Sequence, residues 1–342
     1  MLNSETRSPV ISLPESAHHA DLASRVEASA LPVPGLPAEK PLPYHRLMRQ
    51  NPRSARWWRP LTALAVTVGM YVVFALPMLV FAVFMELVGA PGWKPSATWT
   101  DPTNPTDYVL GLGLLALMIP AAMLGMRWGG GARGIVHSVT SRIRWGLLGR
   151  AAAFVVPIYA LRTGGSFLLD PPADFAWPEV GTSLIAAYVI IIVLAPLQCA
   201  GEEYVFRALP MQMFGAWLRS PLWGILIPVP LFMLGHGYHW AGQIDIAVFA
   251  ICAGALVWKS GGLELAIVMH TANNLTLFLV APFSASSLQQ GAVDPALLLI
   301  SLPFTIGVTA LLWVWISRRY GLRAFEPVTR ASSLTARQGS HG

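Results

Sequence analysis

A few polar side chains in the second half of the sequence have the types and spacing that hydrolysis of a peptide bond needs. They form three short runs: Glu202, Glu203 and Arg207; Phe232 and His236; and His270 and Asn274. A carboxylate and a histidine can hold one water between them, and the carboxylate can remove its proton as general base. Histidine and asparagine can donate hydrogen bonds to the developing oxyanion, and losing one such donor costs about 10²- to 10³-fold in rate.

The spacing of the first run separates its two carboxylates. On a helix, Glu203 and Arg207 are four positions apart in the favourable acidic-before-basic order, so they can pair. Glu202 then points about 100° away from that pair. We therefore predict that Glu202 is the carboxylate left free to act as general base.

The other two runs supply the remaining groups. His236 ends a predicted span and would orient the water beside the carboxylate. His270 and Asn274 lie four positions apart within another predicted span, so they share one helix face and would donate to the oxyanion.

Each run also has a structural interpretation. The first could be a solvated helix end, His236 a packed or interfacial residue, and His270 with Asn274 a hydrogen-bonded pair between helices. A charged side chain at mid-bilayer costs at least about 2.5 to 3.5 kcal/mol. Three such runs on three separate apolar segments therefore favour a functional site.

The sequence does not decide how the water would be activated. It contains neither G-x-S-x-G nor H-E-x-x-H, so the serine-hydrolase and zincin interpretations lack their motifs. Glu202, His236 and His270 would still be a chemically acceptable zinc set, since two histidines and one glutamate can form a catalytic site. Direct and metal-assisted activation both stay open; we assign no metal and expect no required cofactor.

The composition indicates which surroundings hold these residues. Hydrophobic residues make up 54% of the 342 positions and charged residues 12%, whereas soluble domains average roughly 25% charged. The net charge of +6 is spread between apolar stretches instead of forming one basic face, so we expect membrane lipids and no nucleic acid as partners. Cys199 and Cys252 both lie in apolar segments and offer no disulfide framework.

Apolar stretches of suitable length predict an all-α polytopic membrane protein with about eight transmembrane helices. They are Leu61–Val88, Tyr108–Met126, Leu147–Leu161, Ser183–Cys199, Leu222–Leu234, Ile244–Trp258, Leu263–Phe283 and Pro295–Ile316. The third, fifth and sixth are short, and the fifth contains Pro228 and Pro230, so kinks or an internal cavity are expected there.

Lys and Arg concentrate in every second loop, as the positive-inside rule requires. They precede the first span and follow the second, fourth, sixth and eighth: Arg46, Arg49, Arg53, Arg56, Arg59, Arg127, Arg133, Arg142, Arg144, Arg150, Arg207, Arg219, Lys259, Arg318, Arg319 and Arg323. The opposite loops are mainly acidic, with Lys94 and Arg162 as exceptions. We predict a multi-pass protein of the cell (plasma) membrane with both termini cytosolic and the site near the cytosolic leaflet.

These patterns divide the chain into five parts. Residues 1–44 are predicted to be a disordered cytosolic tail, 45–182 N-terminal transmembrane helices with an amphipathic linker, 183–283 the catalytic core, 284–324 the last transmembrane helix and 325–342 a second disordered tail.

At the three runs the chain resembles the CPBP family of intramembrane glutamate proteases, which includes CAAX prenyl endopeptidases and bacterial bacteriocin-processing and immunity (Abi) proteins. The family pattern E-E-x-x-x-R, F-x-x-x-H, H-x-x-x-N occurs in order between about Ser183 and Val280. One departure is Ala208, where many members have glycine.

The resemblance implies a role for each residue. Glu202 would be the catalytic glutamate, His236 its water-binding partner, and His270 with Asn274 the oxyanion donors, while Glu203 and Arg207 would be structural supports. Members have been described both as metalloproteases and as metal-independent proteases. In the CAAX branch the substrate is a prenylated C-terminus.

Three function classes follow. The leading prediction is an intramembrane endopeptidase acting on a lipidated, CAAX-like or membrane-embedded peptide or protein, of unknown oligomeric state. The alternative is a non-enzymatic immunity or scaffold protein whose buried polar residues are structural. A transporter is third, because buried Glu and His can relay protons, but no repeat with paired broken helices is visible in the two halves.

Overall fold

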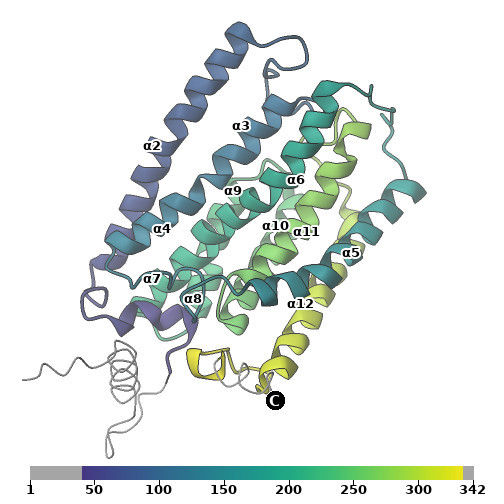
Figure 1. Cartoon of the computed structure of the whole chain (residues 1–342). Helices are drawn as coiled ribbons and strands as arrows, with labels where there is room; N and C mark the ends of the chain where they lie inside the picture. Colours follow the sequence, from purple (N-terminus) through teal and green to yellow (C-terminus); the bar gives the residue numbers. More distant parts are fainter. Residues whose placement is uncertain (1–40, 334–342) are drawn as a thin grey trace, which may run out of the picture. The chain divides into compact units, whose positions relative to one another are not determined.

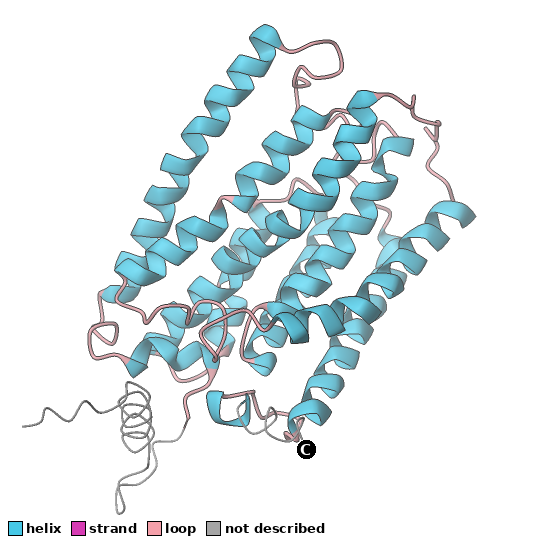
Figure 2. Ribbon diagram, viewed as in Figure 1, coloured by secondary structure: helices cyan, strands magenta, loops and turns pink. Residues whose placement is uncertain are grey.

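The computed structural model describes residues 41–333, and this part of the chain consists of helices and loops without strands (Figures 1 and 2). Seven helical segments in it are long and apolar enough to cross a membrane, which confirms the predicted all-α polytopic class. Most of the two predicted disordered tails, residues 1–40 and 334–342, lies outside the described residues.

The described residues next to these tails are packed against the helices. Tyr44 and Val328 are fully buried, although both fall in the predicted tails. The ammonium of buried Lys259 donates at 2.6 to 3.0 Å to three backbone carbonyls of the C-terminal segment, those of Arg323, Ala324 and Glu326. This lysine, expected only to mark topology, therefore also anchors the end of the described chain.

The membrane-spanning segments are formed by one, two or three consecutive helices each. They are Arg59–Val88 (α2); Pro105–Trp128, made of α3 (Pro105–Ala116) and α4 (Met118–Trp128); Trp145–Leu169 (α5); Thr182–Trp217, made of α6 (Thr182–Glu203), a π-helical turn η2 (Tyr204–Ala208) and α7 (Leu209–Trp217); Trp240–Ser260 (α10); Glu264–Phe283, mainly α11 (Glu264–Val280); and Pro295–Tyr320, mainly α12 (Leu298–Tyr320).

The segment 222–234, predicted as a full span, is too short to cross. It consists of α8 (Leu222–Leu226) and α9 (Pro228–Leu234), interrupted where Pro228 begins the second piece. At about 1.5 Å per residue the two pieces extend roughly 20 Å, against a hydrocarbon core of about 30 Å. The predicted count of about eight is thus seven long segments and one half-length segment.

The fourth span extends much further than predicted. Its expected end was Cys199, but the helical path continues through both glutamates and the π-helical turn as far as Trp217. The charges do not end the helix because they are paired inside the bundle. Glu202 and Glu203 therefore lie in the interior of a long segment, and not at a solvated end.

The bundle is built around α11. This helix packs on α5, α6 and α10, and its first seven residues, Glu264 to His270, are all buried. In turn α6 packs on α3, and α2 packs on α4 at the edge of the bundle (Figure 1). The exposed apolar side chains of α2, such as Val80 and Leu87, suit contact with lipid.

One end of the bundle carries most of the basic residues and is held by buried polar contacts. Arg144 forms a two-pronged ion pair with Glu264, with distances of 2.9 and 2.6 Å, and also donates to the carbonyl of Ser260. A 3₁₀ helix, η1 (Tyr44–Gln50), packs on α7, where Arg46 donates to the carbonyls of Gly215 and Leu218. These donors satisfy carbonyls at a helix end that have no partner within the helix.

Candidate active site

The π-helical turn follows directly after the paired glutamates. The amide of Leu209 donates to the carbonyl of Tyr204, five residues earlier, which widens the helix by one residue at this point. Such turns occur frequently at functional sites. Just before it, Gly201 allows close packing, since a Cβ there would lie 2.2 Å from the carbonyl oxygen of Leu115 on α3. Glu202 is thereby brought against the α3 side of the bundle.

Glu203 lies at the centre of a buried charged cluster. Its Oε1 is 3.2 Å from Nη1 of Arg207 and 2.8 Å from Nδ1 of His270. The guanidinium carbon of Arg207 also lies 4.0 Å from the centre of the Phe232 ring. Glu203 is fully buried and Arg207 nearly so. Because neither charge is solvated by water, each must be stabilised by the other charged or polar groups of the cluster.

Glu202 is linked to the same cluster through His270. Its Oε2 lies 3.3 Å from Nε2 of His270, whose Nδ1 contacts Glu203. One imidazole thus stands between the two carboxylates. The spacing argument left Glu202 without a partner, but the structure gives it a shared one because α11 crosses α6 at this level.

His236 presents one nitrogen for a further interaction. Its Nδ1 lies 2.8 Å from the carbonyl oxygen of Phe232, which can only accept, so Nδ1 carries the proton. The other nitrogen, Nε2, is then the acceptor in the neutral ring. The ring rests on Phe232 with centres 4.7 Å apart and is partly exposed. It can receive a hydrogen bond from a water molecule.

The amide groups of the site come from α11 and α6. Asn274 Nδ2 donates to Oε1 of Gln198 at 3.3 Å, and Asn273 donates to Oδ1 of Asn274 at 3.1 Å. Gln198 was not among the predicted site residues. It precedes Glu202 by four positions, so its place on the same face of α6 was readable from the helical period.

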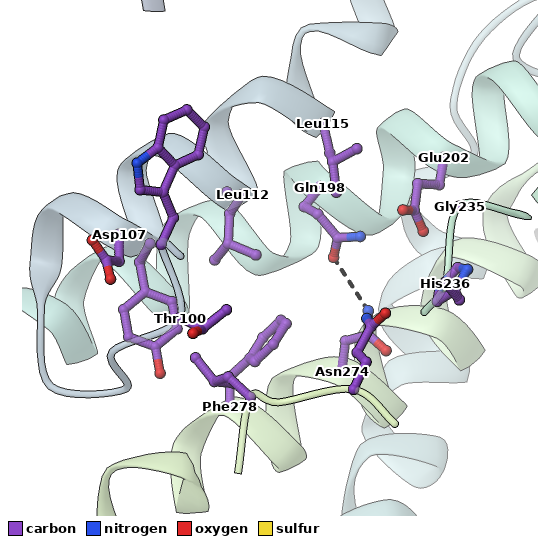
Figure 3. A pocket seen from close by; sticks show the side chains of 15 residues that line it. Thr100, Asp107, Leu112, Leu115, Gln198, Glu202, Gly235, His236, Asn274 and Phe278 are labelled. Carbon is purple, nitrogen blue, oxygen red and sulfur yellow. Dashed lines mark hydrogen bonds between the residues drawn. The ribbon is translucent and has the colours of Figure 1, made fainter. Parts of the chain in front are cut away.

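A cavity of about 260 Å³ brings several of these groups together. Figure 3 shows Gln198, Glu202, His236 and Asn274 directed toward one space from α6, the end of α9 and α11. His270 does not line this cavity, although its Nε2 is 3.3 Å from Oε2 of Glu202; Glu203 and Arg207 do not line it either. Since a water occupies about 30 Å³ in the liquid, the cavity has room for several waters or part of a peptide.

The zinc set considered from the sequence is Glu202, His236 and His270. Nδ1 of His270 contacts Glu203 at 2.8 Å, while its Nε2 lies 3.3 Å from Oε2 of Glu202. Of the three residues, Glu202 and His236 line the cavity, whereas catalytic zinc sites use three protein ligands. Among residues 41–333, no group of three or more His, Cys, Asp or Glu side chains is arranged to hold a metal ion.

Comparison with known proteins supports the resemblance seen in the sequence. Residues 182–276 match the family described as type II CAAX prenyl endopeptidase Rce1-like, and this segment contains every residue of the three runs. The predicted family resemblance is confirmed there. The match supports a membrane-embedded endopeptidase of the CAAX type in general.

A curated relative extends the similarity beyond that segment. The chain is 28% identical over 240 residues to "Uncharacterized protein YyaK" of Bacillus subtilis (strain 168), an alignment that covers 64% of this chain and 76% of the relative. No solved structure matches the chain.

Proposed function

We propose that the protein is an intramembrane endopeptidase that hydrolyses a peptide bond of a lipidated, CAAX-like or membrane-embedded substrate, with Glu202 as general base. One observation carries the proposal. The carboxylate of Glu202, the ring of His236 and the amide of Asn274 line the same cavity, although they come from three different helical segments.

In the proposed reaction a water binds between Glu202 and Nε2 of His236. Glu202 removes one proton while the water oxygen forms a bond to the carbonyl carbon of the substrate. The carbonyl oxygen becomes an oxyanion that Nδ2 of Asn274 stabilises, exchanging its present contact with Gln198 for the substrate. The carbon–nitrogen bond then breaks, and the proton on Glu202 passes to the leaving amine.

The buried cluster would position the base. His270, held by Glu203, restrains the Glu202 carboxylate, and Arg207 compensates the charge of Glu203. We propose that His270 acts through Glu202, as a positioning residue, since it does not line the cavity. This differs from the oxyanion role that the family resemblance implies for it.

We further propose that the reaction needs no metal, because Glu202 and His236 line one cavity and can bind and deprotonate a water directly. The plasma membrane with cytosolic termini stays our proposed location. The basic segments before α2 and after α12 lie at the same end of the bundle, as that topology requires (Figure 1).

Membrane peptidomics tests this function. Cells producing wild-type protein are compared with cells producing Glu202→Gln, with and without a chelator of divalent metals. We expect peptides that depend on wild-type protein, vanish with Glu202→Gln and persist with the chelator. Glu179→Gln, in an exposed loop, is the matched control and should retain them. An identical peptide profile for wild type and Glu202→Gln would refute the proposal.

The non-enzymatic alternative has one observation in its favour, which is the full burial of the Glu203 cluster. A buried charged cluster of this kind can have a purely structural role, in which it holds helices together. Under that interpretation, Glu202→Gln at unchanged abundance would preserve every phenotype of the wild type.

A further inference from the structure

The cavity at Glu202 is closed at one end and exposed at the other. Its inner end is lined by Gln198 and Glu202, with 3% and 6% of their surface exposed. Its other end is lined by Trp99 and Gln290, which are exposed residues of the loops that join α2 to α3 and α11 to α12. These loops therefore flank the exposed end of the cavity.

The loop between α2 and α3, at the exposed end of the cavity, is held in place by hydrogen bonds. Asp107, buried at the start of α3, accepts hydrogen bonds from the amides of Ser96 and Asp101 at 2.9 Å each. These bonds hold the loop that carries Trp99, whose backbone has φ +55°. A positive φ is rare for a large side chain and persists only where the surroundings enforce it. The backbone at Trp99 is thus held at the mouth of the cavity.

The opposite side of the mouth is formed by the loop after α11, which is hydrogen-bonded to the segment that carries His236. The amide of Gly237 donates to the side chain of Gln290, and the amide of His239 donates to the carbonyl of Gly291 at 2.9 Å. The loop after α11 and the segment that presents His236 therefore form one continuous edge.

Within residues 41–333, the cavity at the basic end, lined by Arg142, Arg150 and Arg319 among others, does not include Glu202. Between Glu202 and that end lie Tyr204, Leu209 and Met211, all nearly or fully buried. The loop between α4 and α5 packs on this segment: Nδ1 of His137 shares a hydrogen bond with the Tyr204 hydroxyl, and Gln212 donates to the carbonyl of Ile135 at 2.8 Å.

The two ends also differ in charge. The arginines before α2, after α4, at the start of α5 and at the end of α12 lie at the closed end. The mouth side carries Asp101, Asp174 and Asp294 in its loops and Asp107 at the start of α3, with Lys94 and Arg162 as exceptions. Figure 1 shows the α2–α3 loop at the end of the bundle opposite to η1 and the end of α12. By the positive-inside rule the closed end is cytosolic.

We propose that the site receives its substrate from the extracytoplasmic face of the membrane, through the mouth between Trp99 and Gln290. Of the substrates in the proposed function, this favours a membrane-embedded segment that emerges on that face over a CAAX-like tail presented by the cytosol. The proposal differs from our expectation from sequence of cleavage near the cytosolic leaflet. The direction of access rests on geometry and charge; the identity of what enters rests on the proposed peptidase function.

Cysteine labelling in oriented vesicles tests the direction. Gln290→Cys and Thr100→Cys place a thiol on each wall of the mouth, and Arg133→Cys places one on an exposed loop of the closed end. Wild type, with Cys199 and Cys252, gives the background. A membrane-impermeant maleimide should label both mouth variants in right-side-out vesicles and Arg133→Cys only in inside-out vesicles. The reverse pattern, or equal labelling of all three in one orientation, overturns the proposal.

A second measurement separates this proposal from the proposed function. After external labelling, Gln290→Cys vesicles should lose the cleavage that wild-type vesicles retain under the same treatment. Retained cleavage by fully labelled protein overturns external entry. If Glu202→Gln also cleaves, the catalytic proposal fails while the labelling result on orientation stands.

Discussion

Replacing Arg207 by methionine tests whether the buried cluster is held by charge. The substitution keeps much of the side-chain length but leaves the fully buried Glu203 carboxylate without its cation at 3.2 Å. Removing one partner of a buried pair costs about 3–5 kcal/mol. The cation also lies 4.0 Å from the Phe232 ring, a contact worth up to about 2 kcal/mol when desolvated, which places the cost toward the upper part of that range.

The assay is thermal unfolding of purified protein in detergent. Taking about 2 °C per kcal/mol, as for larger domains, Arg207→Met should lower Tm by about 6–10 °C. Arg150→Met removes an exposed arginine and should change Tm by far less. The double variant Glu203→Gln/Arg207→Met should recover part of the loss, because no unpaired charge is then buried. Equal Tm values for the two arginine variants, or strictly additive losses in the double variant, would refute the reasoning.

Three further predictions concern catalysis and pH. His236→Ala should lower turnover by about 10²- to 10⁴-fold with little change in Tm, since the ring is partly exposed. A loss of turnover that is fully accounted for by a lower fraction of folded protein would contradict its water-binding role. Asn274→Ala should lower kcat by about 10²- to 10³-fold, while Asn273→Ala, its neighbour, should not; matching rates would sink the oxyanion assignment. Burial lowers the pKa of His45 and His137, both outside the spans, so the unfolded chain binds more protons and Tm should fall as pH drops below about 6.5; a flat Tm between pH 7.5 and 5.5 would contradict this.

The polytopic class was readable from the sequence because apolar length is a local property. The ends of the spans were not. Without knowledge of their partners, the charges of Glu202, Glu203 and Arg207 predict the end of a membrane-spanning helix. In the folded chain these charges are compensated by each other and by His270 on α11, which is a long-range contact that no local pattern contains.

The residues of the candidate site were largely predictable, but their arrangement was not. Helical spacing separated Glu202 from the Glu203 pair, yet it could not show that His270 contacts both carboxylates. Arg144 was expected to mark topology, and the structure places it in a buried pair with Glu264. The mouth at Trp99 depends on loop hydrogen bonds to Asp107, for which the sequence carries no recognisable period.

The central claim is that a single carboxylate in the cavity activates the water. Purified wild type, Glu202→Gln and Glu179→Gln, reconstituted into liposomes at equal abundance, are compared for cleavage of a substrate peptide found by the peptidomics experiment. Glu202→Gln should show no turnover above background, while Glu179→Gln cleaves at the wild-type rate. Cleavage by Glu202→Gln at the wild-type rate would contradict the account.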